Sequence, residues 1–237
     1  MGVKKAKNIS AISKENFQKR MFEMVSKKNS YLKIVDTLHV YIAKGNSKTG
    51  ADVPSVSLIP VHNCPNCKAC STLCYDLRND CCYHGCRDKR AVNAAILEAS
   101  PERYFNEIND AVKRFKFFRW HIGGDIINAY YFKKMIWIAE QNPGCEFLAF
   151  TKCFDIVNDY LDKKELPNNL HIIFSAWVGM KMDNRHNLPT SNPLFANGKT
   201  TAHDGAKWCT GNCSECARAG AGCWTMSNGD EVIFPAH

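Results

Sequence analysis

Short apolar runs alternate with longer amphipathic stretches through the middle of the chain. The runs at 117–122, 146–151 and 171–177 have the length and the aromatic and β-branched content of buried strands. Between them, 129–141 and 154–161 carry the spacing of apolar residues that a helix needs. Strands that alternate with helices are typical of parallel βαβ units. The pattern therefore predicts an α/β fold built on a parallel sheet.

Three further helices are predicted before this region. Residues 11–29 and 88–98 repeat apolar residues at helical spacing. Ser100 and Pro101 have the sequence of an N-cap followed by proline at the first helical position, which predicts a third helix that runs to about residue 115.

Two segments in the first third of the chain are predicted to be extended. Residues 34–42 alternate weakly, as a strand would, and the apolar run 53–61 leads directly into Cys64. We expect the second of these to be a strand that ends at a cysteine loop. Beyond residue 178 the chain is rich in Asn, Gly and Pro, and we expect it to be irregular.

The length of 237 residues fits one substantial core, so we expect a single domain over residues 1–237. Within it, 1–50 is predicted to be a basic helical or extended segment. Residues 51–180 form the α/β core with a first group of cysteines, and 181–237 form an irregular segment with a second group.

The formal net charge is +8, and much of it lies in the first 50 residues. A basic surface attracts polyanions, so a nucleic acid or a nucleotide is one expected partner. A solvated basic surface accounts for the same charge without a partner.

Thirteen cysteines are many for a chain of this length. The basic N-terminal residues are not followed by the apolar run of a signal peptide, and no apolar stretch reaches the length of a membrane span. We therefore expect a cytoplasmic protein with no membrane partner. In a reducing cytosol, clustered thiols indicate metal ligands or redox groups rather than disulfides.

The first cysteine group has the spacing C-x2-C-x2-C-x3-C. Its members are Cys64, Cys67, Cys70 and Cys74. Tight turns between the thiols can wrap an iron–sulfur cluster, and bacterial ferredoxins use this spacing. Zinc is the main alternative, since two close C-x2-C pairs can form a tetrahedral site. Cys81, Cys82 and Cys86 follow closely, either as a further ligand or as spare thiols.

The second cysteine group, near the C-terminus, has the spacing C-x3-C-x2-C and is followed by Cys223. Its members are Cys209, Cys213, Cys216 and Cys223. Three cysteines can hold a [4Fe–4S] cluster with one iron open to a substrate or cofactor. If Cys223 is the fourth ligand, the cluster is closed and its role is structural or electron-transferring. A zinc site is the alternative here too.

Polar residues follow the ends of three predicted strands, where parallel α/β proteins bind their ligands. The candidate cofactor-binding residues are Gly123, Gly124, Asp125, Thr151, Lys152 and Ser175. Paired glycines let a backbone approach a ligand closely, and the carboxylate of Asp125 can accept from an ammonium or a hydroxyl group. Asp125 can also act as a helix N-cap, and His121 is either a functional base or a buried core residue.

The order of these parts resembles the small radical S-adenosylmethionine enzymes. The resemblance implies a partial, incomplete parallel α/β barrel. In it, Cys67, Cys70 and Cys74, or a nearby triplet, hold a [4Fe–4S] cluster, and residues 123–125 contact S-adenosylmethionine. The chain departs from that superfamily in its first cysteine spacing and in having Asp at position 125 where Glu is usual. The usual C-x3-C-x2-C spacing occurs only in the second group, so the roles of the two groups could be reversed.

The chain resembles more closely a phage-borne family of cysteine-rich proteins, the gene-product-88 type. The residues that carry this resemblance are Gly45-Asn46-Ser47-Lys48-Thr49-Gly50, a cysteine loop that closes with Cys74-Tyr75, Arg90, Asn93, the segment 119–125 and Phe150-Thr151-Lys152. It covers about residues 40–180 and implies no particular activity.

The leading hypothesis is a radical S-adenosylmethionine-like enzyme with two [4Fe–4S] clusters. Such an enzyme needs an electron donor, and its substrate is unknown, a nucleotide or nucleic acid being one option. The alternatives are a non-catalytic nucleic-acid-binding protein with zinc at both groups and an iron–sulfur redox carrier. A bound cofactor at residues 123–125 would favour the enzyme, zinc at both groups the binding protein, and reversible reduction without a ligand the carrier.

Overall fold

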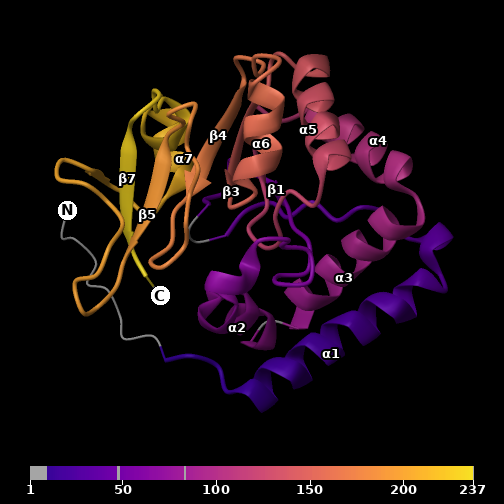
Figure 1. Cartoon of the computed structure of the whole chain (residues 1–237). Helices are drawn as coiled ribbons and strands as arrows, with labels where there is room; N and C mark the ends of the chain where they lie inside the picture. Colours follow the sequence, from indigo (N-terminus) through magenta and orange to yellow (C-terminus); the bar gives the residue numbers. More distant parts are fainter. Residues whose placement is uncertain (1–9, 47–48, 83, 237) are drawn as a thin grey trace.

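A computed structural model of the chain describes residues 10–46, 49–82 and 84–236. In this part of the chain, a seven-stranded sheet has every neighbouring pair of strands parallel (Figure 1). The strands are β1 (Ser55–Val56), β2 (Phe117–Trp120), β3 (Glu146–Thr151), β4 (Leu170–Ser175), β5 (Thr190–Leu194), β6 (Lys207–Trp208) and β7 (Glu231–Pro235). Their order is β1-β2-β3-β4-β5-β7-β6, and the two end strands do not pair with each other. The α/β fold with an open parallel sheet, as in a partial barrel, is confirmed.

The helices lie mostly between the early strands in the sequence. They are α1 (Lys14–Leu32), α2 (Tyr75–Cys82), α3 (His84–Ala99), α4 (Pro101–Val112), α5 (Ala129–Gln141), α6 (Phe154–Leu161) and α7 (Cys213–Arg218). Short 3-10 turns are η1 (Val35–Thr37), η2 (Cys67–Ala69), η3 (Ser71–Leu73) and η4 (Gly222–Trp224).

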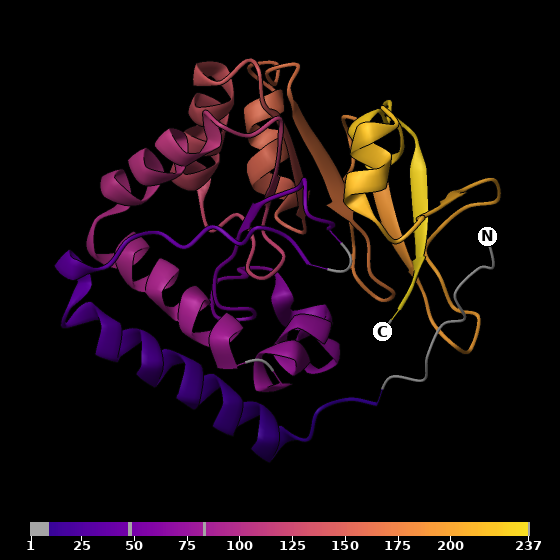
Figure 2. The same cartoon turned by 180° about the vertical axis from the view of Figure 1, so that it is seen from behind.

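The handedness of the crossovers places α7 apart from α5 and α6. The helices α5 and α6 connect strands that step along the sheet from β2 to β4, whereas the step from β6 to β7 runs in the opposite direction. Because crossovers between parallel strands are right-handed, α7 must lie on the opposite face. Figure 1 shows α6 in front of β3 and β4 with α7 behind β5, and Figure 2 brings α7 to the front.

The two faces of the sheet bury different residues, as the alternation of side chains along a strand requires. On the helix face, Phe118, Trp120, Phe147 and Phe174 are fully buried in the main core. On the other face, Phe117, Leu148, Phe150 and Ile173 pack with Trp224 in a smaller cluster. We call this second face the cysteine face, because Cys213, Cys216 and Cys223 pack against it.

Most of the elements expected in the middle of the chain are confirmed. The structure has α5 at 129–141, β3 at 146–151 and α6 at 154–161, with the bounds that the sequence predicts. The strand predicted at 53–61 is shortened to β1, because the prolines at its ends interrupt the ladder.

The strand predicted at 34–42 is wrong. This segment contains η1, and Ala43 forms only an isolated antiparallel bridge with Ser55. Beyond residue 178 the chain has the expected irregular stretches, but β5, β6 and β7 lie among them.

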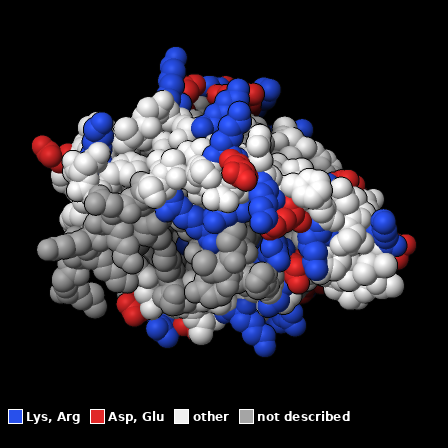
Figure 3. All heavy atoms as spheres, turned by 90° about the horizontal axis from the view of Figure 1, so that it is seen from below, with Lys and Arg blue, Asp and Glu red and all other residues white. Residues whose placement is uncertain are grey.

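Ion pairs join α1 to α3, and each helix contributes both basic and acidic side chains to them. Lys27 lies 3.4 Å from Asp88, Lys28 pairs with Glu98, and Glu23 lies 3.4 Å from Arg87. Figure 3 shows Lys and Arg interleaved with Asp and Glu on the face seen from below. The described part of the basic segment is thus partly neutralised, which weakens the case for a nucleic-acid surface there. None of the described helices has the length and apolar character needed to span a membrane.

Candidate metal and ligand site

The ends of β1 to β4 meet at one rim, where the predicted cofactor-binding residues lie. Asn63, just before the first cysteine group, accepts from the backbone N–H of Asp125 over 2.8 Å. The side chain of Asn66 donates to the backbone carbonyl of Lys152 over 2.9 Å. Lys152 Nζ in turn donates to Ser175 Oγ over 2.9 Å. The structure therefore brings the first cysteine loop together with the ends of three strands, as the parallel arrangement predicts.

The carboxylate of Asp125 is held inside the protein. Its Oδ1 accepts from Thr151 Oγ1 over 2.6 Å and from the N–H of Ile126 over 2.7 Å, and its Oδ2 accepts from the N–H of Lys152 over 2.9 Å. Burial raises the pKa of Asp125, while these three donors act to lower it. In this arrangement Asp125 ties the end of β2 to the end of β3, and its role toward a cofactor stays a prediction.

The two glycines before Asp125 are required for close packing. A Cβ at Gly123 would collide with the carboxylate of Asp76, which forms a buried ion pair of 2.6 Å with Arg90. Gly124 has φ of +85°, and a Cβ there would lie 2.7 Å from the Cβ of Leu58. The space beside both glycines is thus filled by protein, and a contact between them and a cofactor stays a prediction.

His121 is a buried core residue. Its φ of +54° turns the ring away from the cysteine face, and its Nε2 lies 2.9 Å from the hydroxyl of Tyr131. Burial, followed by the charge of Arg119, lowers the pKa of His121 to about 3. The ring is therefore neutral at physiological pH, and the core interpretation of this residue is the one that the structure supports.

The first cysteine group forms a loop of 3-10 turns at the rim. Cys67 opens η2, and Cys74 precedes α2, whose backbone N–H at Leu77 points to Cys74 Sγ over 3.4 Å. Burial raises the pKa of Cys64 and raises that of Cys74 to about 12. The negative charges of Cys67 and Cys74 each raise the pKa of Cys64 further, so these thiols lie near one another.

The second cysteine group gathers from β6, α7 and η4 on the cysteine face. Three of its sulfurs have a hydrogen-bond partner. The N–H of Gly211 donates to Cys209 Sγ over 3.4 Å, and Arg119 Nη1 donates to Cys213 Sγ over 3.4 Å. Thr210 Oγ1 lies 3.2 Å from Cys216 Sγ, and either of these two groups can donate. Charge on each of the other three cysteines helps to raise the pKa of Cys223 to about 12, after burial. Cys223 therefore lies among the other three, as a fourth ligand would.

Arg119 is a site residue that motif spacing did not reveal. It comes from the middle of β2, far from the second group in the sequence, and its side chain crosses the cysteine face to Cys213. Its position in the alternating pattern of β2, between the buried Phe118 and Trp120, was the available signal that it points to the other face.

The segment between Gly45 and Gly50 holds the second cysteine group in place. The carbonyl of Thr49 accepts from the backbone N–H and from the hydroxyl of Ser214, in the first turn of α7, over 3.0 and 2.9 Å. Gly50 has φ of +74°, and a Cβ there would collide with the side chain of Ser214. The described part of this motif is thus a docking loop for α7; Ser47 and Lys48 lie outside the described residues.

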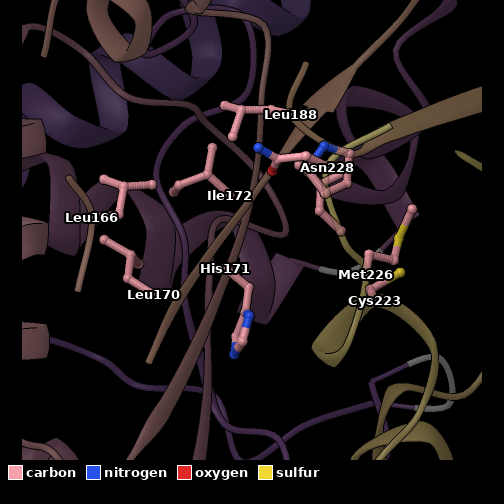
Figure 4. Close-up of a pocket in the computed structure, with 10 residues that line it drawn as sticks. Leu166, Leu170, His171, Ile172, Leu188, Cys223, Met226 and Asn228 are labelled. Carbon is pink, nitrogen blue, oxygen red and sulfur yellow. The ribbon is translucent and has the colours of Figure 1, made fainter. Parts of the chain in front are cut away.

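A cavity of about 150 Å³ opens beside Cys223 (Figure 4). Figure 4 shows Leu166 and Leu170 across the cavity from Cys223 and Met226. Most of the residues that line it are of apolar types, and His171 and Asn228 are polar members. The cavity leaves one side of the second cysteine group uncovered by packed side chains.

The remaining cysteines differ from the two groups. Cys145 and Cys153 are buried among apolar side chains in the main core. Cys86 is exposed. The side chains of Cys81 and Cys82 lie outside the described residues.

The donor chemistry of both groups fits a thiolate-bound metal, but the side chains are not closed around one. Among the described residues, no three His, Cys, Asp or Glu side chains are already arranged to hold a metal ion. Each group nonetheless lies on short turns with its thiols near one another, and Cys209 and Cys213 of the second group each accept a hydrogen bond. Rotation of cysteine side chains toward the centre of each group is therefore needed before a metal can bind.

Comparison with known proteins gives one result. The model of one family, Gene product 88, matches residues 15–225, a range that includes both cysteine groups. A search of curated proteins and a search of solved structures each gave no match.

Proposed function

Since the chain belongs to the Gene product 88 family, whose matched range includes both cysteine groups, we propose that it is an iron–sulfur protein with a [4Fe–4S] cluster in each group. Cys64, Cys67, Cys70 and Cys74 would hold one cluster, and Cys209, Cys213, Cys216 and Cys223 the other. Two such clusters would give the protein a redox function, with an electron donor as its partner.

One observation carries the proposal: a backbone N–H and a guanidinium group donate to Cys209 Sγ and Cys213 Sγ, and a hydroxyl group that can donate lies beside Cys216 Sγ. These groups belong to β2 and to the turn before α7. A thiol is a weak acceptor, whereas a metal-bound thiolate accepts such bonds well, and donors of this kind tune the potentials of iron–sulfur clusters. Burial raises the pKa of Cys209, so a thiolate there needs a bound metal, and these groups would then stabilise the metal-bound thiolates.

The residues at the ends of β1 to β4 support a more specific proposal: the protein is a radical S-adenosylmethionine-like enzyme. A cluster in the first group would lie beside Lys152 and Ser175, because Asn66 of that loop is bonded to Lys152. The Lys152 ammonium, with Ser175 and the Trp177 ring 5.6 Å away, would bind the carboxylate of the cofactor. When bound, the cluster and cofactor would supply one-electron chemistry, and the protein would orient the substrate and exclude water.

Anaerobic purification with iron, sulfide and zinc analysis tests the proposal. We expect about eight irons and eight sulfides per chain, from roughly two four-iron clusters. Cys213→Ser and Cys67→Ser should each remove about half of the iron, whereas Cys145→Ser, in the core, should remove none. Zinc without sulfide in protein never exposed to air would overturn the iron–sulfur function and favour a zinc protein.

The radical-enzyme proposal needs a second measurement. The EPR spectrum of the reduced protein should change when S-adenosylmethionine is added, and Lys152→Met should weaken this response without changing the iron content. An EPR spectrum that does not change when S-adenosylmethionine is added would contradict the radical-enzyme proposal. It would favour an iron–sulfur redox carrier.

A further inference from the structure

Arg119 brings a positive charge into contact with the second cysteine group. Its Nη1 donates to Cys213 Sγ over 3.4 Å, and its guanidinium carbon lies 4.7 Å from the centre of the Phe150 ring. Its Nε is buried and has no hydrogen-bond partner in the described part of the chain. No carboxylate of the described residues forms an ion pair with it.

Arg119 is half-buried, and a cation that has lost part of its hydration is stabilised by a nearby anion. The group in direct contact with this cation is a cysteine sulfur. Phe150 holds the guanidinium against the sheet by a cation–π contact, which fixes the direction of its hydrogen bond. The charge is therefore positioned for a thiolate rather than for a neutral thiol.

We propose that Arg119 is a positioning residue that sets the charge balance and the reduction potential of the metal centre in the second cysteine group. This rests on the proposed function. Reduction of a cluster adds one electron to a site of four thiolates, so a nearby cation that also bonds to a sulfur favours the reduced state. Removing that cation should lower the reduction potential of this cluster and leave the other one less affected.

Potentiometric titration of the anaerobically reconstituted protein, followed by EPR, tests the proposal. We expect Arg119→Gln to disfavour the reduced state of one cluster about tenfold, a shift of about 59 mV to lower potential for one electron. Arg119→Lys should shift the reduction potential less, because lysine keeps the positive charge but lacks the planar guanidinium group and its fixed hydrogen-bond donors. Lys116→Gln removes a charge near the start of the same strand, with no contact to a cysteine sulfur, and should leave both potentials unchanged.

A cobalt titration separates failure of this proposal from failure of the iron–sulfur function. Thiolate-bound Co²⁺ absorbs visible light, and Arg119→Gln should weaken its binding about tenfold relative to Lys116→Gln. A natural chain that takes up neither iron nor cobalt would overturn the proposed function and the role of Arg119 together. A chain that binds metal, with a potential and cobalt affinity that Arg119→Gln does not change, would overturn the role of Arg119 alone.

Folding of the variants is checked by circular dichroism before either measurement. Should Arg119→Gln fail to fold, Arg119→Lys decides the question. Wild-type potential and wild-type cobalt affinity in that variant would contradict the proposal.

Discussion

Single polar residues at the rim are used to join strands, and this limits what they can offer a ligand. The carboxylate of Asp125 accepts hydrogen bonds from two backbone N–H groups and one hydroxyl group. Among the described residues, the ammonium group of Lys152 donates a hydrogen bond only to Ser175 Oγ. A ligand at this rim would therefore meet Lys152 and Ser175 before it met Asp125.

His121 makes the stability of the protein depend on pH. Its pKa is lowered to about 3 in the fold, so below the ordinary value of 6.5 the unfolded chain binds a proton that the folded chain does not. Stability contributed by the neutral ring is therefore lost as pH falls. We expect the free energy of unfolding in urea to drop by about 1 kcal/mol between pH 7 and pH 5.5.

His121→Asn should flatten this dependence, because Asn tolerates a positive φ and does not titrate. The same replacement at exposed His39 is the control and should keep the wild-type slope. If the free energy of unfolding of His121→Asn changes with pH as steeply as that of the wild type, His121 is not the source of the pH dependence.

Gly123 should be intolerant of any side chain. Gly123→Ala places a Cβ against the Asp76 carboxylate and displaces the buried Asp76–Arg90 pair, so we expect a loss of about 3–5 kcal/mol in urea unfolding. Gly144→Ala is the matched control, since a Cβ there meets no atom within 4 Å. Equal stability of the two variants would show that the pair can move aside at little cost.

At the scale of elements, α7 and η4 form a short unit whose position depends on other parts of the chain. It docks through Ser214 on Thr49, and Trp224 of η4 stacks on Phe117 of β2 with ring centres 5.1 Å apart. Helices as short as α7 are not stable alone, so these contacts place the cysteines.

Gly222 gives a direct test of the second cysteine group. It has φ of +64°, and a Cβ there would lie 2.8 Å from Cys216 Sγ. We expect Gly222→Ala to bind about half of the wild-type iron. Gly220→Ala shares the positive φ, of +56°, but its Cβ meets nothing within 4 Å, so it should keep the metal while losing about 1 kcal/mol of stability. Full metal content in Gly222→Ala would contradict the placement of Cys216 as a ligand.

Elements with strong local patterns could be predicted from the sequence, and those that depend on distant partners could not. α5, β3 and α6 have continuous apolar periodicity, so their bounds follow from it. β6 is a two-residue strand with exposed side chains, held only by pairing with β7. Its pattern resembles a loop, and the same holds for much of the chain beyond residue 178.

The candidate site shows the same division. Spacing identified both cysteine groups, and strand order correctly placed Lys152 and Ser175 on one rim with the first group. The alternation of β2 indicates the face on which Arg119 lies, but its contact with Cys213 and the positive φ of His121 depend on tertiary packing. Local patterns therefore do not predict these two features.

On the scale of the whole molecule, the two cysteine groups lie in connections between strands rather than in the strands themselves. The first follows β1, and the second lies in the crossover from β6 to β7, where it packs on the cysteine face against β2, β3 and β4. The middle strands are covered by α4, α5 and α6 and bury large aromatic side chains. Metal binding should therefore stabilise these two connections more than the strands of the sheet.

Hydrogen exchange with and without metal tests this last expectation. A ligand at a thousand times its dissociation constant stabilises the state that binds it by about 4 kcal/mol. Removal of metal by a chelator should thus speed exchange in the two cysteine segments, 64–74 and 209–224, and leave β3 and α5 nearly unchanged. Cys145→Ser alters a buried thiol outside both groups and should show the same hydrogen-exchange rates along the chain as the wild type, with and without metal. Equal acceleration along the whole chain would mean that metal supports the entire core, and no acceleration would mean that neither group binds it.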